Sequence, residues 1–275
     1  GKEQEETMKK SKWFVIAVAA IVVSALVIPV SVMGAESVLD QVKKRGVIKI
    51  GTVLQFPPQM YRDKQGQPAG YDVELMKMLA DDMKVKLEVV DMEFDGLIPA
   101  LLSNKLDMIS CGLVNTPERA LSLEFTDGYV PYRQLVVVPI NSKAKTVADL
   151  NKKGMKITAL MGSTAENIAK RKFPNATVIG FKQQEAMMEV TSGRADAHVA
   201  EEYLCMPLVA NNPTKVKILN PDEPFSAEWG TYAVRPGDYR FLQYLNNWIR
   251  YYRVRGILDA MYDDIIRPTF FETSK

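Results

Sequence analysis

The sequence predicts an α/β protein of two lobes, and two observations carry this prediction. Strand-like and helix-like segments alternate in a first series and then again, more loosely, in a second one. The last segment, residues 239–266, is strongly helical and rich in aromatic side chains. If that segment packs back on the first lobe, the chain crosses between the lobes twice, and two crossings make a hinge.

The first lobe is expected to begin with a β-α-β-α-β series. Its strands and helices follow in turn over residues 47–52, 71–83, 86–90, 96–103 and 105–110. Residues 47–52 alternate apolar and polar side chains as a strand does, whereas residues 71–83 carry apolar side chains at helical spacing. Strands that alternate with helices indicate an open sheet with crossover helices.

The second lobe repeats this pattern over the middle of the chain. Its expected strands and helices alternate over residues 155–160, 163–172, 176–180, 184–192, 195–200 and 201–210. Two further apolar strands, residues 132–140 and 230–234, lie between the patterns of the two lobes. We therefore assign residues 36–138 and 232–275 to the first lobe and residues 139–231 to the second.

The N-terminal segment has the layout of a secretory signal. Three lysines precede an apolar run over residues 13–28, Pro29 interrupts this run, and small residues follow at Gly34 and Ala35. We therefore expect residues 1–35 to be an upstream extension and a signal peptide that is removed, which places the protein in the periplasm. An uncleaved membrane anchor is the alternative, because the apolar run is longer than a minimal signal core.

Composition narrows the function. A hydrophobic content of 47% and a charged content of 25% are ordinary for a globular protein, and a net charge of +2 is too balanced for a nucleic-acid-coating protein. One His and two Cys disfavour a metal site and a His-based catalytic triad, and we expect no cofactor. Cys111 and Cys205 are expected to be buried free thiols, although export permits a disulfide.

The sharpest local signal surrounds Arg119. Thr116 is a good N-cap and Pro117 a good first helical residue, so we expect a helix to begin here. An arginine in the first turn opposes the helix dipole and favours a compensating anion, such as a ligand carboxylate. The alternative is an ordinary capped helix with Arg119 exposed or paired to an aspartate.

The second lobe carries another turn that suits an anion. Gly162 follows an expected strand, and Ser163 with Glu166 fits a capping box at the start of the next helix. Gly162 lets the backbone approach a ligand closely. A routine strand-to-helix turn is the alternative.

Three more side chains follow the ends of expected strands, where α/β proteins place ligand contacts. Glu201 would accept a hydrogen bond from an ammonium group, or it is a solvated acid at a helix start. Phe56 and Phe94 would wall a pocket, or they belong to the core. The lone His198 is expected to be a buried histidine with its hydrogen bonds satisfied.

Five stretches together carry a resemblance to a known family. They are residues 46–51 (GVIKIG), 70–75 (GYDVEL), 96–101 (GLIPAL), 116–119 (TPER) with Phe125, Thr126 and Tyr132 behind it, and 162–164 (GST). In this order, from about residue 38 to residue 266, they resemble the extracellular solute-binding proteins of family 3. Members of that family are the amino-acid-binding components of ABC importers.

The resemblance implies a type II periplasmic-binding-protein fold, in which two α/β lobes are joined by two hinge strands and clamp a ligand between them. By the same resemblance, Arg119 and Thr164 bind the ligand α-carboxylate and Glu201 accepts its α-ammonium. Phe56 stacks on the ligand side chain, and Phe94 forms the opposite wall.

The sequence departs from the family pattern inside the expected site. Val114 stands where the family has a small hydroxyl residue, the loop before it contains Gly112, and Glu201 replaces the usual aspartate. Together with Ser163, these positions are expected to contact a ligand that is an amino acid or another small carboxylate. Relatives specific for Lys or Arg often carry an acid after the first strand, and residues 53–56 (VLQF) have none. A non-basic amino acid is therefore expected.

The first hypothesis is thus a monomeric, non-enzymatic binding protein that delivers an amino acid to an ABC transporter permease. A cyclohexadienyl dehydratase is the second, because such enzymes resemble this family. Leu204 falls where the resemblance puts the catalytic Glu of the dehydratases, which argues against this hypothesis. A ligand-binding input for a membrane sensor is the third.

Overall fold

The computed structural model describes residues 1–2 and 36–268. The chain divides into two units, residues 1–36 and 37–275, and every element named below lies in the second unit. The signal-peptide prediction falls almost wholly outside the described residues. Within the described ranges, no helix is both long and apolar enough to cross a membrane.

The first lobe contains the β-α-β-α-β series that the sequence predicts. Two of its elements, β1 (Val47–Thr52) and α3 (Tyr71–Met83), have the expected bounds. The other elements of this part of the chain are α2 (Val38–Arg45), β2 (Gln55–Phe56), β3 (Met60–Arg62), β4 (Pro68–Ala69), β5 (Lys86–Asp91), η1 (Phe94–Gly96), α4 (Leu97–Leu102), β6 (Met108–Val114), η2 (Arg119–Leu121) and β7 (Glu124–Phe125).

The second lobe alternates strands and helices in the same way, and all six expected elements are present with small shifts of their ends. The chain continues through β8 (Val130–Pro139), η3 (Val147–Leu150), β9 (Lys156–Leu160), α5 (Thr164–Lys172), β10 (Thr177–Phe181), α6 (Gln183–Thr191), β11 (Ala197–Glu201), α7 (Glu202–Ala210), β12 (Val216–Leu219), β13 (Ser226–Val234), α8 (Tyr239–Val254) and α9 (Ile257–Ile265).

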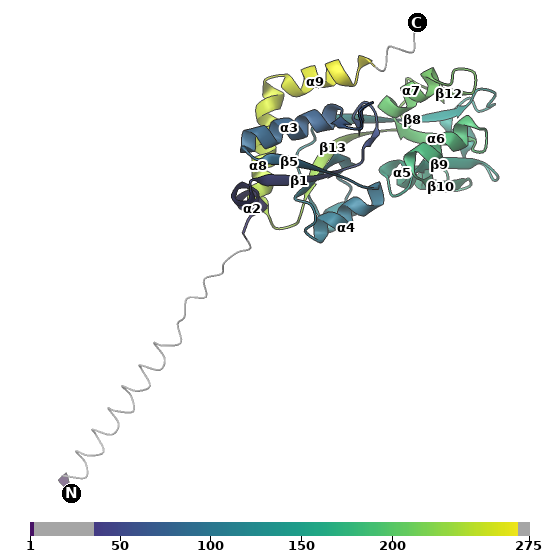
Figure 1. The fold of residues 1–275 in the computed structure, drawn as a ribbon. Helices are drawn as coiled ribbons and strands as arrows, with labels where there is room; N and C mark the ends of the chain where they lie inside the picture. Colours follow the sequence, from purple (N-terminus) through teal and green to yellow (C-terminus); the bar gives the residue numbers. More distant parts are fainter. Residues whose placement is uncertain (3–35, 269–275) are drawn as a thin grey trace. The chain divides into compact units, whose positions relative to one another are not determined.

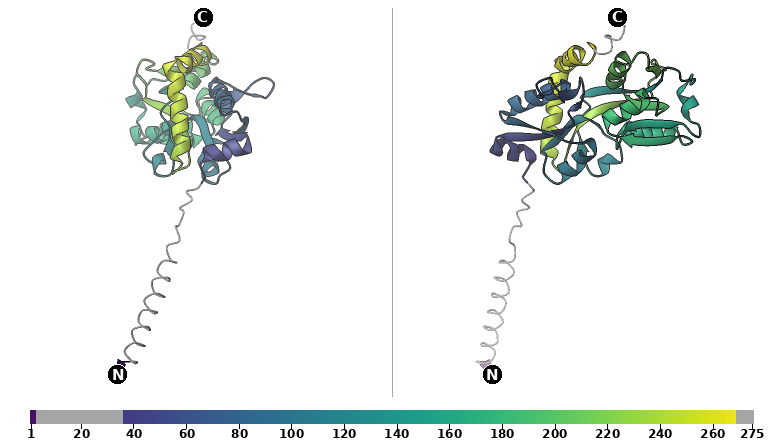
Figure 2. Two further views of the ribbon diagram at one scale, coloured as in Figure 1. Left: turned by 90° about the vertical axis from the view of Figure 1, so that its left-hand side faces the viewer. Right: turned by 45° about the vertical axis from the view of Figure 1, so that its right-hand side comes forward.

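One curled sheet runs through both lobes in the order β10-β9-β11-β8-β13-β6-β1-β5. Its two central strands, β8 and β13, pair antiparallel with each other. β8 also pairs with β11 of the second lobe, and β13 pairs with β6 of the first. These two strands therefore join the lobes, with α3 and α8 on one side and α5 and α6 on the other (Figures 1 and 2). The boundaries given above from the sequence stay a prediction.

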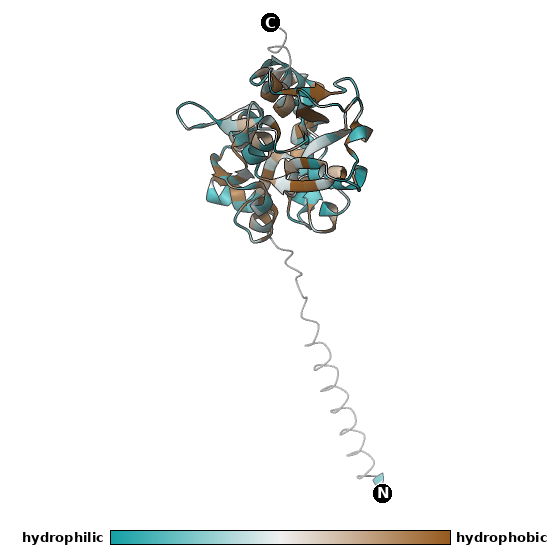
Figure 3. Cartoon of the chain, turned by 90° about the vertical axis from the view of Figure 1, so that its right-hand side faces the viewer, coloured by the Kyte–Doolittle hydropathy of each residue, from teal (hydrophilic) through white to brown (hydrophobic). Residues whose placement is uncertain are grey.

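The buried apolar residues form two cores: the larger extends from the first lobe into the second, where it includes Val190 and Cys205, and the smaller lies on the second-lobe side. Ile48, Leu75 and Phe241 belong to the larger core, and Ile157, Ala169 and Phe225 belong to the smaller one. Figure 3 shows hydrophobic residues concentrated on the strands and hydrophilic residues in the loops at the margin of the view. Because β8 and β13 carry the chain from one lobe to the other, these two strands are where relative motion is expected.

The C-terminal helices pack on the first lobe, as the sequence predicts. The indole Nε1 of Trp248 on α8 donates to Asp82 of α3 at 2.7 Å. The Asp238 carboxylate before α8 accepts from the Ser37 hydroxyl at 2.7 Å and caps Phe241 N of its own helix. The expected single helical segment is two helices, because Gly256 adopts a left-handed conformation between them.

Two local expectations near Arg119 are wrong. Residues 119–121 form one 3₁₀ turn rather than the start of a longer helix. Leu121 is exposed and Leu123 is buried, so the segment offers no continuous apolar face for a helix to bury. The expected loop around Gly112 is part of β6, which continues to Val114.

Candidate functional site

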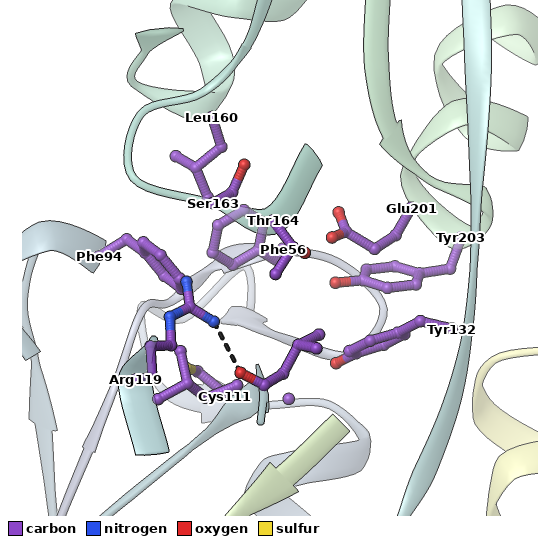
Figure 4. Close-up of a pocket in the computed structure, with 13 residues that line it drawn as sticks. Phe56, Phe94, Cys111, Arg119, Tyr132, Leu160, Ser163, Thr164, Glu201 and Tyr203 are labelled. Carbon is purple, nitrogen blue, oxygen red and sulfur yellow. Dashed lines mark hydrogen bonds between the residues drawn. The ribbon is translucent and has the colours of Figure 1, made fainter. Parts of the chain in front are cut away.

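A pocket between the two lobes gathers all eight residues expected to contact a ligand (Figure 4). Its lining comprises Phe56, Phe94, Cys111, Gly112, Leu113, Val114, Arg119, Tyr132, Leu160, Ser163, Thr164, Glu201 and Tyr203. The cavity is small, at about 30 Å³. That volume holds about one water molecule, so a larger ligand requires the lobes to separate or the pocket to be entered from an adjoining space.

Arg119 lies on the first lobe and reaches across to the second. Its guanidinium donates to Val114 O at 2.9 Å and to Gly162 O at 3.0 Å, and it lies over the Phe94 ring at 5.7 Å. Burial lowers the pKa of the guanidinium, which remains charged. Arg119 has no ion pair with any carboxylate in the described residues, so neither the fully exposed nor the aspartate-paired alternative describes it.

The start of α5 brings free N–H groups to the pocket. Ser163 Oγ accepts from Glu166 N at 3.2 Å, whereas the Glu166 carboxylate accepts from Gly162 N at 2.7 Å. The capping box is therefore shifted by one residue from the expected reciprocal pair. The backbone N–H groups of Thr164 and Ala165 have no intrahelical partner, and they favour an anion at this end of the helix.

The Thr164 hydroxyl is already engaged by the hinge strands. It donates to Glu228 Oε2 at 3.0 Å and accepts from Gln134 Nε2 at 3.0 Å. Gln134 lies on β8 and Glu228 on β13. A carboxylate in the pocket would therefore meet the backbone N–H of Thr164 rather than its hydroxyl.

Glu201 ends β11 and points into the pocket from the second lobe (Figure 4). Burial raises the pKa of its carboxyl to about 7, and the nearby Glu228 carboxylate adds to this rise. Its neighbour Glu202 pairs with Arg133 at 3.3 Å, but no cation among the described residues pairs with Glu201. A half-buried carboxylate without a counter-charge favours a cationic ligand group.

Two tyrosines close the pocket on the hinge side. The rings of Tyr132 and Tyr203 lie 5.8 Å apart between centroids. The Tyr132 hydroxyl leaves no room at Gly112, where a Cβ atom would lie 1.5 Å from it and φ is +61°. Tyr132 belongs to a quoted family motif, whereas Tyr203 follows Glu201 by two residues with no motif to mark it.

A buried polar network lies behind Tyr132. Gly112 N donates to Tyr129 Oη at 2.9 Å, and this hydroxyl donates to Asp72 at 2.7 Å. Gln59 Nε2 donates to Asp72 at 3.2 Å and to the Tyr132 hydroxyl. Burial raises the pKa of Asp72 to about 7. The network supports Gly112 and Tyr132 through Gln59, Asp72 and Tyr129, for which the sequence suggested no functional role.

A second contact joins the lobes near Phe94. The Lys182 ammonium before α6 donates to Glu93 before η1 at 2.8 Å. Together with the bond from Arg119 to Gly162 O, it holds the two sides of the pocket against each other.

The remaining chemical candidates are structural. Cys111 and Cys205 are buried free thiols, as expected, and burial raises the pKa of both. His198 is fully buried against the Thr158 hydroxyl, at 3.2 Å from its Nδ1, and burial lowers its pKa to about 4. This agrees with the expected satisfied core histidine.

Comparison with known proteins identifies the family. Residues 48–267 match the model of the bacterial extracellular solute-binding proteins, family 3. An L-arginine-binding protein of Pseudomonas aeruginosa is 40% identical over 56% of this chain and 60% of its own length. The arginine-binding extracellular protein ArtP of Bacillus subtilis is 30% identical over 77% of this chain and 81% of its own length.

A solved structure extends the likeness to the fold. The crystal structure of the ancestral amino acid-binding protein AncCDT-1, a precursor of cyclohexadienyl dehydratase, superposes with a TM-score of 0.77 at 35% identity. The match covers 84% of this chain and all of that one. The fold is the type II periplasmic-binding-protein fold, and the chain belongs to family 3 of the bacterial extracellular solute-binding proteins.

Proposed function

We propose that this protein captures an amino acid between its lobes and delivers it to an ABC importer in the membrane. One observation carries the proposal: Arg119 and Glu201 enter one pocket from opposite lobes, and neither has an ion-pair partner in the described residues. A zwitterion supplies one opposite charge to each of them. Its carboxylate pairs with the Arg119 fork and the start of α5, and its ammonium pairs with Glu201.

The binding cycle follows from the contacts. Phe56 and Phe94 wall the pocket, with Gly112, Val114 and Ser163 beside them. The ligand enters when the lobes are apart, and the closed form gains the contacts that it makes to both lobes. Its differential affinity for that form shifts the population toward closure.

Two parts of the proposal concern the whole protein. Residues 1–35 contain a signal peptide, so the protein works in the periplasm as a monomer that docks on a permease. N-terminal sequencing of the protein recovered from the periplasm tests this, with a start near Glu36 expected. A start upstream of residue 13 would mean that the apolar segment is retained as an anchor.

The pocket is proposed to bind without turnover. Leu204, at the position where the resemblance puts the catalytic Glu of the dehydratases, is buried in α7 and does not line the pocket. No conversion of prephenate or arogenate is therefore expected. Measurable dehydration of either compound would replace the binding-protein proposal with an enzymatic one.

A thermal-shift screen of the twenty amino acids followed by calorimetry tests the central proposal. A ligand that binds only the folded state raises the melting temperature by mass action. Arg119→Lys keeps the charge and loses the bidentate fork, and we expect it to weaken binding about 100-fold. Arg240→Lys is the matched control, because Arg240 pairs with Asp40 and neither residue lines the pocket. Binding that survives unchanged in Arg119→Lys would contradict the proposal.

A further inference from the structure

The structure assigns Glu228 a role in ligand selection: we propose that its carboxylate receives the positively charged side chain of the ligand. This inference rests on the proposed capture of an amino acid and names its class, a cationic one. It replaces the expectation of a non-basic ligand, which considered only the loop at residues 53–56.

The first ground is space. The pocket at Arg119 measures about 30 Å³, whereas a groove of about 420 Å³ adjoins it and shares Val114 and Thr164 with its lining. In this form the pocket is smaller than any amino acid, so a ligand anchored at Arg119 and Glu201 extends into adjoining space. The groove beside Val114 provides that room, and Glu228 lies in its wall.

The second ground is the bonding of Glu228. Its Oε2 accepts from the Thr164 hydroxyl at 3.0 Å and from Gln134 Nε2 at 3.3 Å, so the carboxylate is held in one position. Its Oε1 accepts no hydrogen bond from the described residues. The buried Gln134 Oε1 likewise has no hydrogen-bond partner there. A fixed carboxylate with one open oxygen in the wall of the groove suits a donor-rich cation.

The third ground is charge. Arg119 contributes one positive charge to the region, and Glu201 and Glu228 contribute two negative ones when both are ionised to pair with a bound cation. Glu118 and Arg171, which also line the groove, are exposed and offset each other. A neutral zwitterion leaves one negative charge unbalanced, whereas an amino acid with a cationic side chain balances all three groups.

The other acids near the first-lobe wall are already occupied. Asp91 accepts from Arg62 at 2.7 Å and from Leu54 N at 2.9 Å. Glu93 pairs with Lys182. These bonds leave Glu228 as the acid that combines a fixed position, an open oxygen and a place in the adjoining groove.

Calorimetry with arginine and citrulline tests the inference, because these probes have the same length and differ in side-chain charge. The full chain is expected to bind arginine at least tenfold more tightly than citrulline. Glu228→Gln should weaken arginine binding about tenfold and change citrulline binding less than threefold. Glu223→Gln, which is exposed and lines neither cavity, should change neither Kd, and Glu228→Asp should retain the preference for arginine.

The outcomes distinguish a failure of this inference about Glu228 from a failure of the proposed amino-acid binding. If no amino acid binds, the proposed function fails and the inference falls with it. If arginine binds and Glu228→Gln leaves the arginine-to-citrulline ratio unchanged, the inference alone is overturned. Tighter binding of citrulline by the unaltered protein would also overturn it. Melting curves of each variant show whether a lower affinity reflects a loss of folding. If Glu228→Gln does not fold, the ratio of arginine to citrulline affinity is measured in Glu228→Asp instead.

Discussion

Lowering the pH from 7 to 5 should weaken ligand binding through Glu201. The pKa of this carboxyl in the free protein is raised to about 7, mainly by burial. Its ionised fraction therefore falls from about one half at pH 7 to about 0.01 at pH 5. Only the ionised form pairs with an ammonium group, so the apparent Kd should rise about 50-fold. The α-carboxylate and α-ammonium of the ligand keep their charges over this range.

Calorimetry at pH 7, 6 and 5 measures this effect, with Glu201→Gln as the partner variant. Other titratable groups near Glu201 come from several elements. Burial raises the pKa of Cys111, Tyr132 and Tyr203, so they stay neutral throughout. Glu228 also has a raised pKa and leaves a residual slope in the variant. A wild-type Kd that changes less than threefold, or a variant profile as steep as the wild type, would refute the reasoning.

Three further predictions concern the framework of the pocket. Glu93→Lys or Lys182→Glu should weaken ligand binding about twofold to fivefold, as expected for an exposed ion pair, and the exchanged double variant should restore it in calorimetry. Asp72→Asn should flatten the pH dependence of stability in urea unfolding. Because the pKa of Asp72 is raised in the native state, that state binds more protons than the unfolded state. The free energy of unfolding therefore falls by up to about 4 kcal/mol as pH rises from 4 to 7. A variant whose free energy of unfolding depends on pH as steeply as that of the wild type would contradict this. Gly112→Ala should displace the Tyr132 hydroxyl and weaken ligand binding more than tenfold. The control Gly193→Ala also places a Cβ atom at a positive φ, but in open space, and should leave the Kd unchanged. Equal effects of the two substitutions on the Kd would contradict this account.

Local patterns were sufficient to place several side chains of the site. Glu201 was found because it follows a strand end, and strand ends of an α/β sheet meet at one edge. Thr164 was found through the family resemblance. Ser163 was found because a serine directly before an expected helix is typically its N-cap, and the N-terminus of a helix suits an anion. Arg119 was found for its chemistry, although the element that carries it is a 3₁₀ turn and not a longer helix.

Glu228 and Tyr203 could not be found in this way. The apolar residues 230–234 marked only the second half of β13, because the first half alternates half-buried and exposed positions beside the hinge. Glu228 therefore lay outside the expected strand. Its link to Thr164 spans 64 positions and depends on the pairing of β13 with β8, which no local pattern records. Tyr203 sits on α7, where an aromatic side chain is as typical of the core as of a pocket.

Removing one charge at a time from the ligand tests the central claim most directly. Calorimetry compares the amino acid that binds best with three of its analogues. The carboxamide and the amine without a carboxyl group lack the negative charge, and the acid without an α-amino group lacks the positive one. The account predicts that each analogue binds at least 100-fold more weakly, because each leaves Arg119 or Glu201 without its partner. Analogues that bind within threefold of the amino acid would contradict a site built on these two charges.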